Sequence, residues 1–136
     1  MILADSSAWV EFDRATGSPV DQRMTELVTN DGPLAMTEPV LMEVLAGARS
    51  DQREEQLRRL LLRYPLLRFD AVVDFEAAAG IYRRCRRVGV TPRGMVDCMI
   101  ASVAQRHSAS LLAADADLAR VASVVGIEMD EASLRS

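Results

Sequence analysis

Lysine is absent from this chain of 136 residues, and all 16 of its basic residues are arginine. Every mechanism that needs a lysine is therefore excluded. There is one histidine, His107, so a Ser-His-Asp or Cys-His triad is excluded unless this residue supplies the base. His107 lies near the end of an apolar helical segment, where we expect a capping or surface role.

Cysteines and aromatic residues are also few. Cys85 and Cys98 lie in separate segments without CxxC spacing, which argues against a zinc site or a disulfide and favours buried, reduced thiols. Aromatic residues make up 4% of the chain, so we expect base stacking to contribute little beyond residues such as Trp9 or Tyr82. We expect Trp9 itself in the core or at an interface.

The sequence has neither a basic leader nor an apolar run long enough to span a membrane. We therefore expect a cytoplasmic protein without a membrane span, folded as one domain over residues 1–136. The formal net charge is −4, but this mild acidity does not exclude RNA, because the local field around a site matters more than the total.

Short apolar runs alternate with segments of helical periodicity along the chain. This order predicts an α/β fold with a central, mostly parallel sheet and helices on both faces. Strands are predicted at residues 1–4, 34–36, 110–114 and 123–129, and a strand or extended connector at 66–69. Helices are predicted near residues 21–30, 37–48, 51–63, 75–88 and 95–106, with a polar tail at 130–136.

Acidic residues stand where such a sheet would bring them together. Asp5 and Asp115 each end a predicted strand, and in parallel sheets ligands gather at the carboxyl ends of the strands. Glu43 and Asp97 lie on helices that could point at the same edge, although a glutamate on a wet helix face and an aspartate in a first turn are also ordinary structural features. Asp117 is a fifth candidate.

If these carboxylates converge, each raises the pKa of its neighbours, and a bound cation would remove the conflict. Oxygen ligands without nearby cysteine or histidine select Mg²⁺ or Mn²⁺ rather than zinc. A candidate phosphate-binding patch lies upstream of Asp97, in arginines that have no acidic residue three or four positions before them. Its members are Arg83, Arg84, Arg86 and Arg87, with Arg93 in the following loop.

Four acidic segments of the chain resemble the motifs of PIN-domain ribonucleases. They are ILADSS (2–7), PVLMEVLAG (39–47), MVDCMIA (95–101) and LLAADADL (111–118). Each is weak alone, but the ordered set is specific, and its length and spacing are similar to those of VapC-type toxins of bacterial toxin–antitoxin pairs. The resemblance implies a PIN-like three-layer fold.

It further implies an endoribonuclease specific for single-stranded RNA and dependent on Mg²⁺ or Mn²⁺. Such proteins are usually homodimers inhibited by a cognate VapB-type antitoxin. By carry-over, Asp5 and Asp97 would bind the metal directly, Glu43 and Asp115 would orient water or hold a second ion, and Asp117 is a less certain member. We expect in-line attack by water, leaving a 5′-phosphate and a 3′-hydroxyl.

The sequence departs from the family pattern at two places. Ala113 stands where many members have threonine or serine, which removes a hydroxyl, and Leu118 stands where many have an aromatic residue.

Two other classes of function compete with the nuclease. A phosphoryl-transfer enzyme with Asp5 as nucleophile, of the haloacid-dehalogenase or receiver type, would call for a lysine that this chain lacks. A catalytically inactive PIN fold used for binding is the other alternative. Retention of the whole acidic set, which is costly to keep together without a metal, argues against it.

Overall fold

Three parallel strands form the centre of the fold. The order is β2-β1-β3, in which β1 (Ile2–Ala4) pairs with β2 (Leu34–Ala35) on one side and β3 (Ser110–Leu112) on the other. The structure is a computed structural model that describes residues 1–134. Leu3 and Leu111 are fully buried, as expected where both faces of a parallel sheet are covered.

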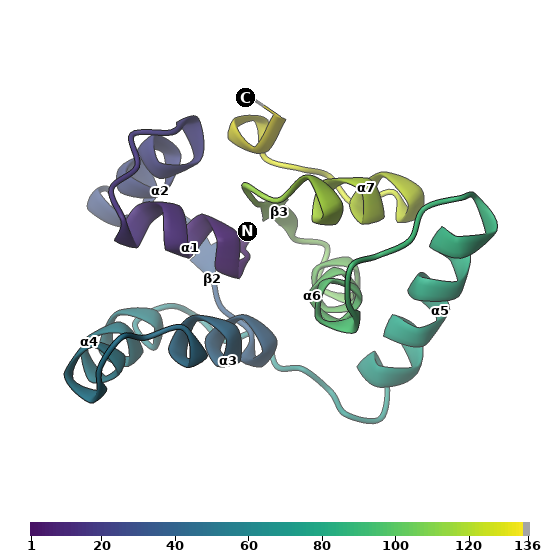
Figure 1. Cartoon of the computed structure of the whole chain (residues 1–136), viewed down its shortest axis with the longest axis horizontal. Helices are drawn as coiled ribbons and strands as arrows, with labels where there is room; N and C mark the ends of the chain where they lie inside the picture. Colours follow the sequence, from purple (N-terminus) through teal and green to yellow (C-terminus); the bar gives the residue numbers. More distant parts are fainter. Residues whose placement is uncertain (135–136) are drawn as a thin grey trace.

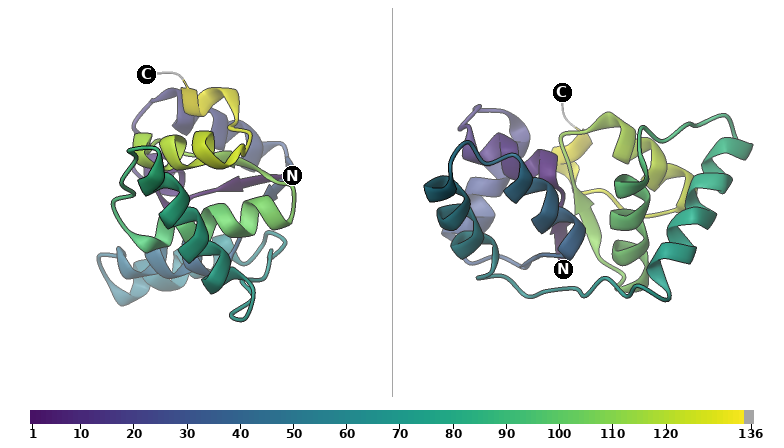
Figure 2. Two further views of the ribbon diagram at one scale, coloured as in Figure 1. Left: turned by 90° about the vertical axis from the view of Figure 1, so that its right-hand side faces the viewer. Right: turned by 60° about the horizontal axis from the view of Figure 1, so that its bottom comes forward.

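Helices cover the sheet on both faces, which confirms the predicted α/β architecture. Figure 1 shows α1 to α4 on one side of the strands and α5 to α7 on the other, and Figure 2 shows the same division from two further directions. The helices are α1 (Ser6–Asp13), α2 (Pro19–Thr29), α3 (Glu38–Ala46), α4 (Asp51–Leu61), α5 (Asp74–Arg87), α6 (Met95–Arg106) and α7 (Ala116–Val125). Within residues 1–134, none of the helices is long and apolar enough to cross a membrane.

The predicted last strand at 123–129 is wrong over most of its length. Its first residues belong to α7, which buries Leu118, Val121 and Val125 at helical spacing and ends at Gly126 in the left-handed conformation (φ 76°). The run Val-Val-Gly-Ile is apolar enough to suggest a strand. The segment is helical instead because the apolar residues of α7 pack into the core at helical spacing. Only Met129 pairs with the sheet, through an isolated parallel bridge.

The segment at 66–69 is an extended connector rather than a strand. Leu66 forms one parallel bridge with Met36, whose N–H donates to the carbonyl of Pro65 (2.8 Å) and whose carbonyl accepts from Leu67 (2.7 Å). The sheet is thus extended by a single residue on each outer side.

Three expectations about scarce residues are confirmed. Cys85 and Cys98 are buried free thiols. Trp9 is buried in the core, where its ring contacts Phe12 at a centroid separation of 6.0 Å. His107 follows the last residue of α6 as its C-cap.

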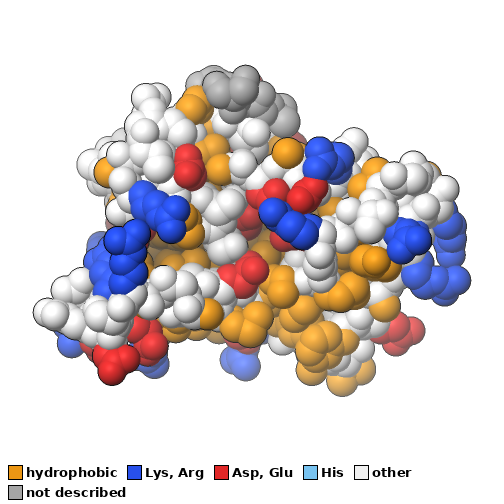
Figure 3. Space-filling view, in the orientation of Figure 1, with side chains coloured by type: hydrophobic (Ala, Val, Ile, Leu, Met, Phe, Trp, Pro, Cys, Tyr) orange, Lys and Arg blue, Asp and Glu red, His pale blue; other side chains and the backbone are white. Residues whose placement is uncertain are grey.

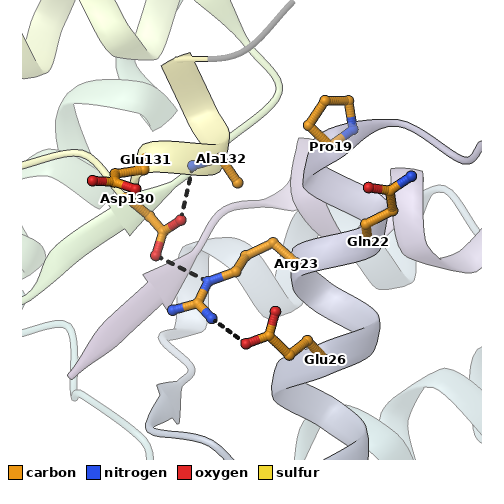
Figure 4. A pocket seen from close by; sticks show the side chains of 7 residues that line it. All are labelled: Pro19, Gln22, Arg23, Glu26, Asp130, Glu131 and Ala132. Atoms are coloured by element: carbon orange, nitrogen blue, oxygen red, sulfur yellow. Dashed lines mark hydrogen bonds and ion pairs between the residues drawn. The ribbon is translucent and has the colours of Figure 1, made fainter.

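The end of the described chain packs against α2. Here Arg23 forms ion pairs with Asp130 (3.2 Å) and Glu26 (2.9 Å), beside a cavity of about 400 Å³ (Figure 4). The predicted polar tail contains a short 3₁₀ helix, η1 (Glu131–Leu134), and its Ala132 is buried. The tail and the predicted domain run to residue 136, and residues 135 and 136 lie outside the described residues.

Candidate active site

Asp5 ends β1 and caps α1. Its carboxylate accepts hydrogen bonds from the Ser7 hydroxyl (2.6 Å) and from the Ala8 N–H (3.0 Å). Burial raises the pKa of Asp5 to about 7; the two hydrogen bonds oppose this rise, while the charges of Asp97 and Asp115 add to it. Asp5 is therefore a carboxyl group near half-ionisation at neutral pH.

Asp97 lies in the first turn of α6, as the sequence predicts. Its pKa is raised to about 6, first by burial and then by the charges of Asp115 and Glu43; the Arg93 guanidinium acts in the opposite direction. These electrostatic interactions show that three of the predicted carboxylates come together with Asp5 at one edge of the sheet.

Glu43 reaches this edge from α3 and accepts a hydrogen bond from the Ser6 hydroxyl (2.8 Å). Ser7 joins two strand ends, because its hydroxyl donates to Asp5 and accepts from the Ala114 N–H (2.9 Å). Neither serine is among the site residues predicted from the sequence. Their position directly after Asp5 could have indicated such a role, because hydroxyls at the start of a helix commonly form hydrogen bonds with nearby polar groups.

Asp115 and Asp117 occupy the start of α7. Asp115 is the N-cap, and one of its oxygens accepts from the Asp117 N–H (2.9 Å). Arg93 Nη2 lies 2.6 Å from Oδ2 of Asp115, and Arg93 Nε lies 3.3 Å from Oδ2 of Asp117. Asp117 also pairs with Arg120. Asp117 thus belongs to the charged rim of the site.

The structure shows the surroundings of both departures from the family pattern. The Ala113 N–H donates to the hydroxyl of Ser133 (3.0 Å), so a hydroxyl from a distant segment contacts this strand end. Leu118 is fully buried and belongs to the core, which accounts for an aliphatic residue at this position.

An open cavity of about 680 Å³ lies over these side chains. Figure 3 shows acidic side chains gathered at the centre of this face, with basic side chains beside them. Asp5 lies buried below, at the end of β1. The polar lining includes Ser6, Ser7, Glu43, Arg93, Asp97 and Asp115.

The predicted arginine patch divides. Arg93 lines the cavity, whereas the arginines of α5 are exposed on that helix and do not line it. Among them, Arg86 donates a long hydrogen bond to the Tyr82 hydroxyl (3.5 Å). The role of Arg83, Arg84, Arg86 and Arg87 in RNA binding stays a prediction.

The donor chemistry fits a hard divalent cation. The carboxylates are oxygen ligands, and the raised pKa values of Asp5 and Asp97 reflect burial together with an excess of negative charge that a cation would relieve. Within residues 1–134, however, no group of three or more His, Cys, Asp or Glu side chains is arranged to hold a metal ion. Arg93, placed between Asp115 and Asp117, supplies the nearest compensating charge.

The chain resembles known proteins over nearly its whole length. The PIN-domain family matches residues 2–124. Ribonuclease VapC11 of Mycobacterium tuberculosis is 44% identical over 129 residues, covering 94% of this chain and 96% of that protein. The chain therefore belongs to the PIN-domain family and, within it, to the VapC group.

Solved structures share the fold at low sequence identity. A VapBC2 structure from Rickettsia felis, bound to a promoter DNA fragment, superposes with a TM-score of 0.73 at 18% identity, covering 96% of this chain and 98% of that one. A DNA-bound VapBC structure from Salmonella typhimurium gives 0.70 at 19% identity, covering 95% and 96%. The predicted PIN-like fold is thus confirmed.

Proposed function

We propose that this protein is a metal-dependent endoribonuclease that acts as the toxin of a toxin–antitoxin pair and cleaves single-stranded RNA. The observation that carries the proposal is Asp97, a half-buried carboxylate with raised pKa that faces an open cavity beside Asp115 and Glu43. Its place in a first helical turn fixes the direction of the carboxylate. Family membership and the similarity to a named VapC ribonuclease support the same activity.

In this proposal Asp5 and Asp97 hold Mg²⁺ or Mn²⁺, while Glu43 and Asp115 position water or a second ion and Asp117 contributes from the rim. A bound divalent ion supplies Lewis-acid chemistry: it lowers the pKa of water and neutralises charge at the phosphate. The hydrogen bond from Ser6 orients Glu43, and the hydrogen bond from Ser7 orients Asp5.

The bond that forms joins a water oxygen to phosphorus, and the bond that breaks joins phosphorus to the 3′-oxygen. The carboxylates accept the proton of the attacking water, directly or through a second water, and the departing 3′-oxygen takes up a proton from solvent water. In-line displacement leaves a 5′-phosphate and a 3′-hydroxyl.

Partners follow from the same family membership. The proposal includes a VapB-type antitoxin that blocks the acidic cavity, a homodimer, and action in the cytoplasm. VapBC assemblies among structures of the same fold support the antitoxin. Sedimentation velocity of the purified chain, alone and co-expressed with the antitoxin, tests both associations.

The decisive experiment compares Asp97→Asn with Asp51→Asn. Asp51 is also a first-turn aspartate, but it starts α4, and it does not line the cavity. We expect Asp97→Asn to abolish cleavage of single-stranded RNA with the fold retained, and Asp51→Asn to cleave normally. Full cleavage by wild-type protein that has been freed of metal with a chelator would contradict the metal-dependent mechanism.

A further inference from the structure

A second groove, of about 530 Å³, adjoins the acidic cavity. Its walls come from α1, α3 and α4. Val10 and Glu43 line both hollows, so the groove begins at the carboxylate edge of the candidate active site. Trp9, Arg14, Arg49 and Leu57 are among the other residues of its lining.

The net charge of this groove's lining is positive, because Arg14, Arg49 and Arg53 outnumber the carboxylates Asp13 and Glu43. Arg14, at the end of α1, and Arg49, between α3 and α4, are both exposed. Neither guanidinium has an ion pair or a hydrogen-bonding partner among residues 1–134. A third arginine of the lining, Arg53, pairs with Asp13, so those two charges cancel. Figure 3 shows basic side chains gathered on the left of this face, beside the central acidic ones.

The wall of the groove also contains a donor without an acceptor. Trp9 is buried, and within residues 1–134 its Nε1–H has no hydrogen-bonding partner. Buried indole N–H groups usually find one. Because this N–H is itself shielded from solvent, it is an unsatisfied group behind the wall of the groove and not a donor offered to a ligand.

We propose that this groove binds the RNA strand next to the bond that is cut, and that Arg14 and Arg49 contact its phosphates. This inference rests on the proposed function, and it adds where the RNA strand lies beside the active site. The carboxylates of the cavity repel a polyanion, so the affinity for RNA has to come from cations outside the cavity. Arg14 stands four residues beyond Val10, which is about 6 Å along the axis of α1, so the positive charge begins about one helical turn from the cavity.

RNA suits the groove better than a protein segment does. The two arginines without a partner are exposed, so each can meet one phosphate, whereas the carboxylate of Glu43 lies at the end that the groove shares with the cavity. The end of the groove away from the acidic cavity is lined by polar side chains. A docked helix would instead need an apolar floor along the whole length of the groove.

The test measures binding without cleavage, in the Asp97→Asn background. A fluorescent single-stranded oligoribonucleotide is titrated at several salt concentrations against the Arg14→Gln/Arg49→Gln variant. The matched control is Arg58→Gln/Arg63→Gln, which removes two exposed arginines that do not line the groove. Because the groove variant leaves two phosphates without a cation, the slope of log Kd against log salt should fall by about 1.4, at about 0.7 for each neutralised phosphate of a single strand.

An unchanged slope would overturn the proposal. An equal fall of the slope in the control variant would also overturn it, because the effect would then come from the total charge of the protein and not from the groove. If the groove variant instead weakened the complex with a co-expressed antitoxin and bound RNA normally, the groove would belong to the protein partner. Because the readout is binding, a falling slope supports the groove even if wild-type protein proved unable to cut RNA.

Discussion

The guanidinium of Arg93 lies 2.6 Å from the carboxylate of Asp115 and bridges to Asp117 at 3.3 Å. The Arg93 side chain is 68% exposed, so water screens both ion pairs and their net contribution to stability is small. A divalent cation can therefore displace the guanidinium at little cost. Arg93 thus acts as a replaceable positive charge for a cavity that otherwise holds an excess of carboxylates.

Replacing Arg93 with glutamine should therefore strengthen Mg²⁺ binding. The substitution removes a competing cation and also raises the pKa of Asp97 further, because Arg93 now lowers it. We expect Mg²⁺ binding to become tighter by a few-fold at most, because water screens the exposed guanidinium. Calorimetric titration measures the affinity, and Arg120→Gln, which removes a contact to Asp117 alone, is the control. Unchanged Mg²⁺ affinity in Arg93→Gln would contradict this role.

The pKa values of Asp5 and Asp97 predict an unusual stability profile for the metal-free protein. Both are raised from 3.8, to about 7 and about 6, so the folded state holds protons that the unfolded chain has lost. Stability therefore falls as the pH rises from about 4 to about 7, since the folded state binds more protons in that window. For Asp5 the integrated effect is roughly 4 kcal/mol, because one pKa unit corresponds to about 1.4 kcal/mol.

Thermal unfolding between about pH 5 and pH 8 in a chelator tests this prediction. The Tm of wild-type protein should fall with rising pH, and Asp5→Asn should flatten the profile and be the more stable protein at the alkaline end. Mg²⁺ should restore the lost stability by binding the ionised carboxylates. A flat profile in metal-free wild-type protein would mean that Asp5 and Asp97 titrate normally.

The α/β topology explains why so much of the acidic site could be predicted. The apolar runs predict the positions of the three strands. Because the carboxyl ends of parallel strands share one edge of a sheet, the sequence also predicts that Asp5 and Asp115 lie close together. The same reasoning failed at residues 123–129, because a short apolar run is compatible with both the helical and the strand periodicity, and only its packing partners distinguish them.

Positions of long side chains could not be predicted in this way. Arg87 and Arg93 are near neighbours in sequence, yet the chain leaves α5 through Gly89 in the left-handed conformation (φ 82°), and only Arg93 lines the cavity. The link from Ser7 to Ala114 joins residues 107 positions apart, and no local pattern specifies such a contact.

Ser7 provides a test of how Asp5 is held. Its hydroxyl donates to Asp5 and accepts from Ala114, so Ser7→Ala removes one bond from a buried carboxyl and leaves a backbone N–H without that partner. We expect a loss of about 1–2 kcal/mol in the free energy of unfolding. The acidic limb of the pH–rate profile should also move to higher pH, because the Ser7 bond lowers the pKa of Asp5. Ser123→Ala, at an exposed position of α7, is the control, and an unmoved acidic limb would contradict the role.

Asp74 joins α5 to α6 from a fully buried position away from the acidic cavity. Its carboxylate accepts from Ser102 Oγ (2.7 Å) and from Arg106 Nε (3.1 Å) and Nη2 (2.7 Å). Burial alone would raise the pKa of Asp74, but the bonds from Arg106 and Ser102 outweigh it and the pKa is lowered. The stabilisation is therefore present above the unfolded pKa of about 4 and is lost as the pH falls through the lower folded value.

Removing this carboxylate should destabilise the fold without touching the chemistry. Asp74→Ala leaves the buried Ser102 hydroxyl and the partly exposed Arg106 without their acceptor, a change that typically costs about 1–3 kcal/mol. Urea unfolding at neutral pH measures the loss, and Glu76→Ala, an exposed first-turn residue of the same helix, should change stability little. Because Asp74 does not line the cavity, protein that remains folded should keep its kcat. A large fall in kcat with unchanged stability would instead connect this ion pair to the active site.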